Sequence, residues 1–136
     1  MIKKLTLAAV VATFLSPIAA WAEQVDYEKG LVKQALAEGK TVFVDYAADW
    51  CITCKIQEDA IDAARAQNPA YDENILFVRV DWDRFSRAKI ATDYNIPRRS
   101  TLIVLKGDKE LGRNVADTRG REIKKLLDIA LAAASS

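Results

Sequence analysis

The chain contains two cysteines, Cys51 and Cys54, separated by two residues. The pattern places Cys51 between a buried strand and the first turn of a helix, where unpaired backbone N–H groups and the helix dipole favour a thiolate. One helical turn then brings Cys54 close enough to form a disulfide with Cys51. We therefore expect Cys51 to attack the disulfide of a partner and Cys54 to resolve the mixed disulfide.

Two other interpretations of this pair remain open. The first is a static structural disulfide, although a bridge across two residues closes almost no loop and so contributes little stability. The second is a thiol-based metal site, although such sites need about four ligands and one chain supplies two thiols.

A charged residue in an apolar strand is the second candidate for chemistry. Asp45 lies six residues before Cys51, in the middle of an apolar run. Burial there raises a carboxyl pKa, so Asp45 is a candidate general base and acid for the Cys54 proton. Two alternatives compete with this role: Asp45 is solvated at a strand end, or Arg79 of the next strand pairs with it and lowers its pKa.

Hydrophobic periodicity predicts the elements that position these residues. Helices are expected over 26–38, 51–67, 86–94 and 118–133, with Ser86 as an N-cap, and strands over 41–47, 75–81, 101–105 and 110–115. Strands that alternate with helices favour parallel pairing, and the tight turn at 106–109 adds an antiparallel edge. The fold class is therefore α/β, with a mixed sheet of about four strands flanked by helices and an extra N-terminal helix.

The first 22 residues are predicted to be a signal peptide rather than part of the fold. Lys3 and Lys4 precede an uncharged apolar run over 5–15, and Ala20-Trp21-Ala22 has small residues at a peptidase site. An uncleaved anchor or a buried helix is the alternative. Cleavage after Ala22 leaves a domain over 23–136 in an exported compartment, the bacterial periplasm, where disulfides are permitted.

Composition narrows the classes of function. Lys and Arg number 20 against 19 Asp and Glu, so nucleic acid is not expected as a partner. The chain has no histidine, which excludes Ser–His and Cys–His catalysis and His-ligated metal. We expect no cofactor beyond the cysteine pair.

The segment from Val44 to Lys55, with Trp50 before Cys51 and Lys55 after Cys54, resembles the active-site segment of thioredoxins. It is most similar to the C-terminal periplasmic domain of DsbD-type reductases. The resemblance implies a thioredoxin fold, Cys51 as nucleophile, Cys54 as resolving thiol and Asp45 as the buried carboxylate. Trp50, Lys55 and Arg79 are then neighbours of the site.

The loop before the third strand departs from the family, which places a cis-proline there opposite the cysteines. Counting back from the turn at 106–109 puts Ser100 at that position and Pro97 three residues early. We expect Ser100, with a trans peptide bond, to face the cysteines. The partner-binding loop then comprises Pro97, Arg98, Arg99, Ser100 and Thr101, and its arginines favour a Cys51 thiolate or an acidic partner surface.

The resemblance implies an exported protein-disulfide reductase that takes electrons from a membrane thiol transporter and passes them to disulfide-containing periplasmic proteins. A monomer is expected. The Ile52-Thr53 dipeptide differs from the Gly-Pro of cytosolic thioredoxins, which leaves the direction of electron flow open. The alternative function is a module that binds a metal or an iron–sulfur cluster, because loss of the cis-proline can open such a site to a cluster shared between two chains.

Overall fold

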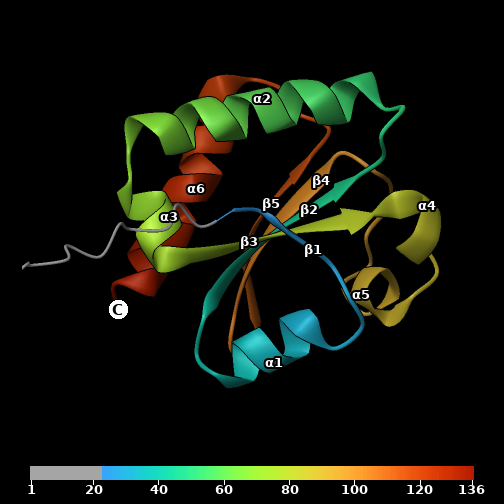
Figure 1. Cartoon of the computed structure of the whole chain (residues 1–136), viewed down its shortest axis with the longest axis horizontal. Helices are drawn as coiled ribbons and strands as arrows, with labels where there is room; N and C mark the ends of the chain where they lie inside the picture. Colours follow the sequence, from blue (N-terminus) through green and yellow to red (C-terminus); the bar gives the residue numbers. More distant parts are fainter. Residues whose placement is uncertain (1–22) are drawn as a thin grey trace, which may run out of the picture.

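A strand buried on both faces lies at the centre of the molecule. In this computed structural model, which describes residues 23–136, all seven residues of β2 (Thr41–Ala47) are buried. Its Val and Phe side chains alternate between the two faces of the sheet, so each face supplies one wall of a core. Helices cover both faces (Figure 1). This burial confirms that Asp45 is not a solvated residue at a strand end.

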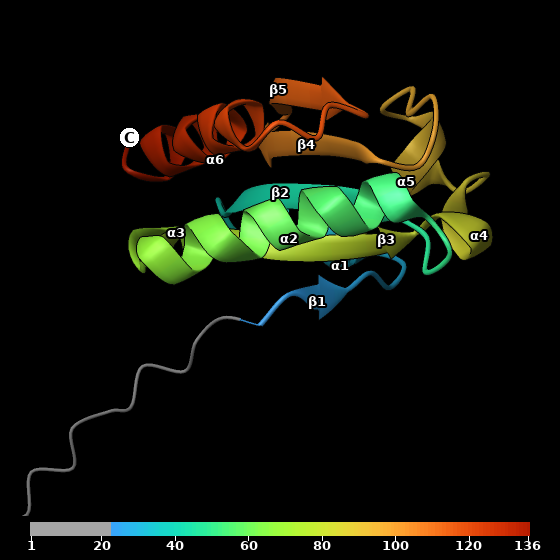
Figure 2. The ribbon, with the colours of Figure 1, turned by 90° about the horizontal axis from the view of Figure 1, so that it is seen from above.

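The sheet has five strands in the order β1-β3-β2-β4-β5, and Figure 2 shows them following one another in space. The other strands are β1 (Val25–Asp26), β3 (Ile75–Asp81), β4 (Thr101–Lys106) and β5 (Lys109–Val115). β3 runs parallel to β2 and β1, whereas β4 runs antiparallel to β2 and β5. The predicted mixed sheet is thus confirmed, with one strand more than expected.

Two layers of helices enclose the sheet. One face is covered by α2 (Ile52–Gln67), α3 (Ala70–Asn74) and α6 (Gly120–Ala134), which pack around Phe43 and Phe77. The other is covered by α1 (Leu31–Ala37) and α5 (Lys89–Thr92), which pack around Val44 and Tyr46, and α4 (Trp82–Phe85) lies beside them. No helix within residues 23–136 has the length and apolar character needed to cross a bilayer.

The structure corrects two predicted helices. The predicted helix over 26–38 is shorter, because residues 25–26 pair with β3 as β1 and Gly30, at φ +93°, lies just before α1. The predicted helix over 86–94 is reduced to the single turn α5, and the other single turn, α4, ends before residue 86. Asp81 caps α4 through the Asp83 amide, so Ser86 ends that turn rather than starting a helix, and the extended Ala88 separates it from α5.

The antiparallel direction of β4 also differs from the expectation that alternating elements pair in parallel. A four-residue helix rises only about 6 Å, which is far less than the roughly 20 Å length of a six-residue strand. Neither α4 nor α5 can return the chain to the start of the sheet. The chain therefore enters β4 from the end where β3 finished, which brings residue 100 to the same end of the sheet as Cys51.

The close packing of α6 on β5 gives a test of the fold. A Cβ atom on Gly112 would lie 2.7 Å from Leu126 Cδ1. We expect Gly112→Ala to lower the free energy of unfolding by about 1–3 kcal/mol, because the buried Leu126 side chain must move to admit the methyl group. Gly120→Ala is the matched control, since nothing lies within 4 Å of that position. Equal urea midpoints for Gly112→Ala and the control would contradict this packing.

Candidate functional site

The turn from β2 into α2 holds both cysteines as predicted. Cys51 is the N-cap of α2, and its Sγ accepts a hydrogen bond from the Cys54 backbone N–H at 3.2 Å. The two residues form a disulfide, with their Cα atoms 5.3 Å apart. Cys54 is fully buried, whereas Cys51 is slightly exposed. The more accessible cysteine is therefore the one beside the helix N-terminus, where a thiolate is favoured.

Ser100 faces the two sulfurs from the other side. Its Oγ lies 3.2 Å from Cys51 Sγ and 3.1 Å from Cys54 Sγ. Pro97 is exposed, and no peptide bond within residues 23–136 is cis. The expectation that Ser100 rather than Pro97 lies opposite the cysteines, with a trans bond, is confirmed.

Ser100 occupies a left-handed conformation, with φ +61°. Its N–H donates to the Tyr46 carbonyl at 2.7 Å, and its carbonyl accepts from the Ala116 N–H at 2.8 Å. These two bonds tie the residue to the end of β2 and to the chain after β5. The backbone therefore fixes where the hydroxyl points, although this conformation is costly for any residue except glycine.

Asp45 is fully buried, and it pairs in register with Arg79 on β3 and with Leu102 on β4. Neither carboxyl oxygen has a partner at hydrogen-bond geometry. Burial, and after it the negative charge of Glu58, raise the pKa of Asp45 to about 8 against the opposing effect of Arg79. The prediction that burial dominates the pKa of this carboxyl group is the one the structure supports.

Arg79 does not form the ion pair with Asp45 that was the competing expectation. Its Nε donates to Glu58 at 3.0 Å, and its terminal nitrogen donates to Asp49 at 3.1 Å. Glu58 was not identified from the sequence as part of the site. Its place four residues after Cys54, on the same side of a helix, was the signal that could have found it.

A buried amide pair was also missed. Gln57 is fully buried one turn after Cys54, and its Nε2 donates to Asn114 Oδ1 at 3.3 Å and to the Asp117 carbonyl at 3.2 Å. These bonds tie the first half of α2 to the end of β5. Polar groups buried in this way restrict the orientation of the helix that carries the cysteines.

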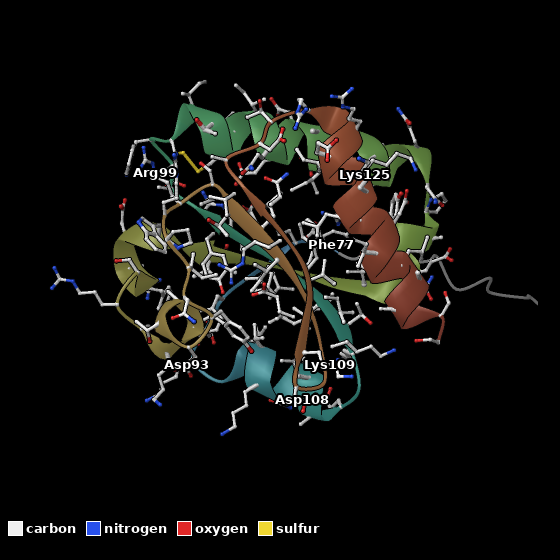
Figure 3. The ribbon with its side chains drawn as sticks, turned by 180° about the vertical axis from the view of Figure 1, so that it is seen from behind. Phe77, Asp93, Arg99, Asp108, Lys109 and Lys125 are labelled. Carbon is white, nitrogen blue, oxygen red and sulfur yellow. A yellow bond between two sulfur atoms is a disulfide. The ribbon has the colours of Figure 1, made fainter. Side chains whose placement is uncertain are left out.

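Two exposed apolar side chains flank Cys51 in the sequence. Trp50 is 62% exposed and Ile52 is 73% exposed. The Trp50 indole N–H donates to Asp83 at 2.9 Å, and the Arg99 guanidinium lies 4.4 Å from the Trp50 ring centre. Figure 3 shows the disulfide beside Arg99, away from the Asp108–Lys109 turn. Trp50, predicted as a neighbour of the site, is therefore exposed and held in place by two charged side chains.

The remaining predicted residues are less directly involved. Lys55 is exposed and pairs with Asp59 rather than with the cysteines. Arg98 donates to the Arg99 carbonyl, and the Thr101 hydroxyl donates to the Arg98 carbonyl. These bonds shape the loop predicted to bind partners, and whether the loop does so stays a prediction.

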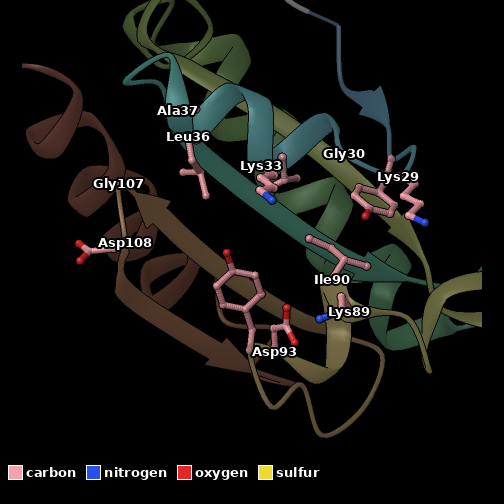
Figure 4. A pocket seen from close by; sticks show the side chains of 13 residues that line it. Lys29, Gly30, Lys33, Leu36, Ala37, Lys89, Ile90, Asp93, Gly107 and Asp108 are labelled. Carbon is pink, nitrogen blue, oxygen red and sulfur yellow. The ribbon is translucent and has the colours of Figure 1, made fainter.

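A pocket of about 700 Å³ lies apart from this site, on the face covered by α1 and α5 (Figure 4). Lys33, Leu36 and Ile90 are among the side chains that line it. Cys54 is carried by α2, on the opposite face, so the pocket does not belong to the thiol site. Within residues 23–136, no group of three or more His, Cys, Asp or Glu side chains could hold a metal ion.

The raised pKa of Asp45 predicts a pH-dependent stability. The unfolded chain loses this proton near about pH 4, whereas the folded protein keeps it until a pH of about 8. Between these values the folded state binds more protons, so the free energy of unfolding falls as pH rises. In the wild type, this carboxyl group should make the free energy of unfolding fall by on the order of 3–5 kcal/mol between about pH 4 and about pH 8, and Asp45→Asn should abolish that fall. Urea unfolding of the oxidised protein across this pH range measures the difference.

Asp62→Asn is the control, because the Asp62 side chain is largely exposed on α2. It should leave the pH profile of the wild type unchanged. An Asp45→Asn profile that parallels the wild type would show that this carboxyl group is not the buried acid.

Comparison with known proteins agrees with this geometry. A family model described as thioredoxin-like matches residues 20–104. Thioredoxin-T of Drosophila melanogaster is 32% identical over 76 residues, which are 56% of this chain and 45% of that protein. The thiol:disulfide interchange protein DsbD of Pseudomonas sp. (strain JR1 / K1) is 29% identical over 76 residues, 55% of this chain and 13% of that protein. The chain thus spans less than half the length of either relative.

A solved structure, that of Trxlp from Edwardsiella tarda EIB202, superposes with a TM-score of 0.66 at 30% identity. The match covers 76% of this chain and 98% of that one. The matched family model spans more than half of the chain, including the Cys51–Cys54 turn, Asp45 and Ser100. The chain therefore belongs to the thioredoxin-like family, and its Cys51–Cys54 disulfide lies within the region that the family model matches.

Proposed function

We propose that the chain is an exported thiol–disulfide oxidoreductase that acts as a reductant of disulfides in periplasmic proteins. The observation that carries the proposal is the disulfide at the N-terminus of α2, with Cys51 as N-cap and the buried Asp45 on the adjoining strand. A structural role explains this arrangement poorly, because the bridge joins residues only three apart and closes almost no loop.

The proposed reaction moves two electrons from the protein to its partner. The Cys51 thiolate attacks one sulfur of the partner disulfide, forms a mixed disulfide and releases the other sulfur as a thiolate. The Cys54 thiol then loses its proton, and its sulfur attacks Cys51 Sγ. This step closes the Cys51–Cys54 disulfide and frees the second partner sulfur.

Asp45 is the proposed acceptor of the Cys54 proton. Its raised pKa lies close enough to neutrality for the carboxyl group to take up and return a proton during turnover. The carboxyl oxygens have no hydrogen-bonded partner among residues 23–136, so the proton passes through water or after a small movement.

The proposed direction of electron flow follows the sequence resemblance to DsbD-type reductases. Two DsbD proteins of Pseudomonas, each named as a thiol:disulfide interchange protein, are 29% and 30% identical to this chain over the matched region. By analogy, we propose a membrane thiol transporter as the electron donor and disulfide-containing proteins as acceptors. The exposed Trp50 and Ile52 beside Cys51 would provide apolar contact for such partners.

Replacing each cysteine in turn tests the reaction. We expect Cys54→Ser to accumulate a mixed disulfide with a disulfide-containing peptide, because Cys51 still attacks but nothing resolves the product. Cys51→Ser should form no adduct, because Cys54 is buried. Mass spectrometry under non-reducing conditions distinguishes the two variants. Adduct formation through Cys54 in Cys51→Ser would reverse the proposed roles.

Export is tested by locating the full-length chain in a Gram-negative host. We expect the periplasmic fraction to contain a protein that begins at Glu23. This mature protein would lack Lys3 and Lys4, so it would have 18 basic and 19 acidic residues in place of the 20 and 19 of the full chain. Val10→Asp, which places a charge in the apolar run, should keep the protein in the cytoplasm. Wild-type chain that stays uncleaved in the cytoplasm would overturn this part of the proposal.

A further inference from the structure

Ser100 combines two features that ordinary packing does not require. It is fully buried with φ +61°, a conformation in which a glycine would be less strained. Its hydroxyl nevertheless lies within 3.2 Å of both sulfurs of the disulfide. A strained, non-glycine residue at a reactive site is an observation from which a functional role can be argued.

Counting protons shows that these two contacts cannot both be hydrogen bonds in the oxidised protein. A serine hydroxyl has one proton to donate, and disulfide sulfurs carry none. At most one of the contacts is therefore a hydrogen bond when Cys51 and Cys54 are joined. The hydroxyl oxygen can still accept a hydrogen bond, but neither sulfur of the disulfide has a proton to donate to it.

Reduction changes this count. Two electrons and one proton convert the disulfide into a Cys51 thiolate and a Cys54 thiol. The Cys54 S–H can then donate to Ser100 Oγ, while the Ser100 O–H donates to the Cys51 sulfur, which now bears a full negative charge. Hydrogen bonds to an ionised acceptor are stronger than those between neutral groups. The reduced protein thus gains one bond and strengthens another.

We propose that the Ser100 hydroxyl is a catalytic group that bridges the two thiols, donating to the Cys51 thiolate and accepting from the Cys54 thiol. It stabilises the reduced state over the disulfide and so raises the reduction potential of the couple. This inference rests on the proposed function, because it concerns the same reaction. It adds a group that touches both reacting atoms and that tunes the equilibrium between them.

The backbone of Ser100 offers a competing, purely structural explanation. Its N–H and carbonyl bond Tyr46 and Ala116, so the residue also joins the ends of β2 and β5. These bonds use no side-chain atom, and both alanine and glycine retain them. Ser100→Ala keeps the backbone strain and loses the hydroxyl, whereas Ser100→Gly relieves the strain and loses the hydroxyl. The two variants therefore separate the two explanations.

The test measures the acidity of Cys51 in the reduced protein, from the pH dependence of its alkylation by iodoacetamide. In both variants we expect the acid dissociation constant to fall about tenfold, which is a rise of one unit in the pKa of Cys51. The equilibrium with glutathione should move about tenfold toward the disulfide, equivalent to a potential about 30 mV lower. Ser86→Ala, which removes a hydroxyl just after α4, is the control and should match the wild type.

Two results would overturn the role of Ser100. Unchanged Cys51 acidity in both variants would show that the hydroxyl makes no bond to the thiolate. Shifts of opposite sign in Ser100→Ala and Ser100→Gly would assign the effect to the backbone. Failure of the proposed function has a different signature, because the wild-type protein itself would then lack a reversible couple or have the potential of an oxidant. Urea unfolding of each variant shows whether its fold is intact.

Discussion

The thiol site depends on the sharp passage of the chain from β2 into α2. β2 is buried along its whole length, so its carboxyl end is fixed by the sheet, and α2 begins one residue after Cys51. The Cys51 sulfur consequently meets the first free backbone N–H groups of the helix, and Cys54 follows one turn later beneath it. Changes that move β2 or the start of α2 would therefore move both sulfurs.

In the proposed mechanism, two buried groups act on the couple in opposite directions. An ionised Asp45, on the strand that leads into Cys51, would repel a Cys51 thiolate and so disfavour the reduced state. The Ser100 hydroxyl can favour that state by bonding to the thiolate. The raised pKa of Asp45 reflects how poorly this site tolerates a negative charge. The potential of the couple is the balance of these effects.

The sequence predicted the parts of the fold that follow from local pattern. Apolar runs located the four long strands, and the counting of turns placed Ser100 opposite the cysteines. The sequence could not show that Arg79 bonds Glu58 and Asp49 instead of Asp45, because that choice depends on where α2 lies over β3. The two-residue β1 was also missed, since its only support is pairing with β3.

The reduction potential of the Cys51–Cys54 couple, measured on the domain from Glu23 onward in glutathione and thiol buffers, tests the central claim most directly. The proposed reductant should have a potential of about −230 mV or lower, in the range of thioredoxin-like couples. A value near about −120 mV, typical of a dithiol oxidant, would contradict the proposed direction of electron flow. The absence of any reversible couple would contradict the oxidoreductase function itself.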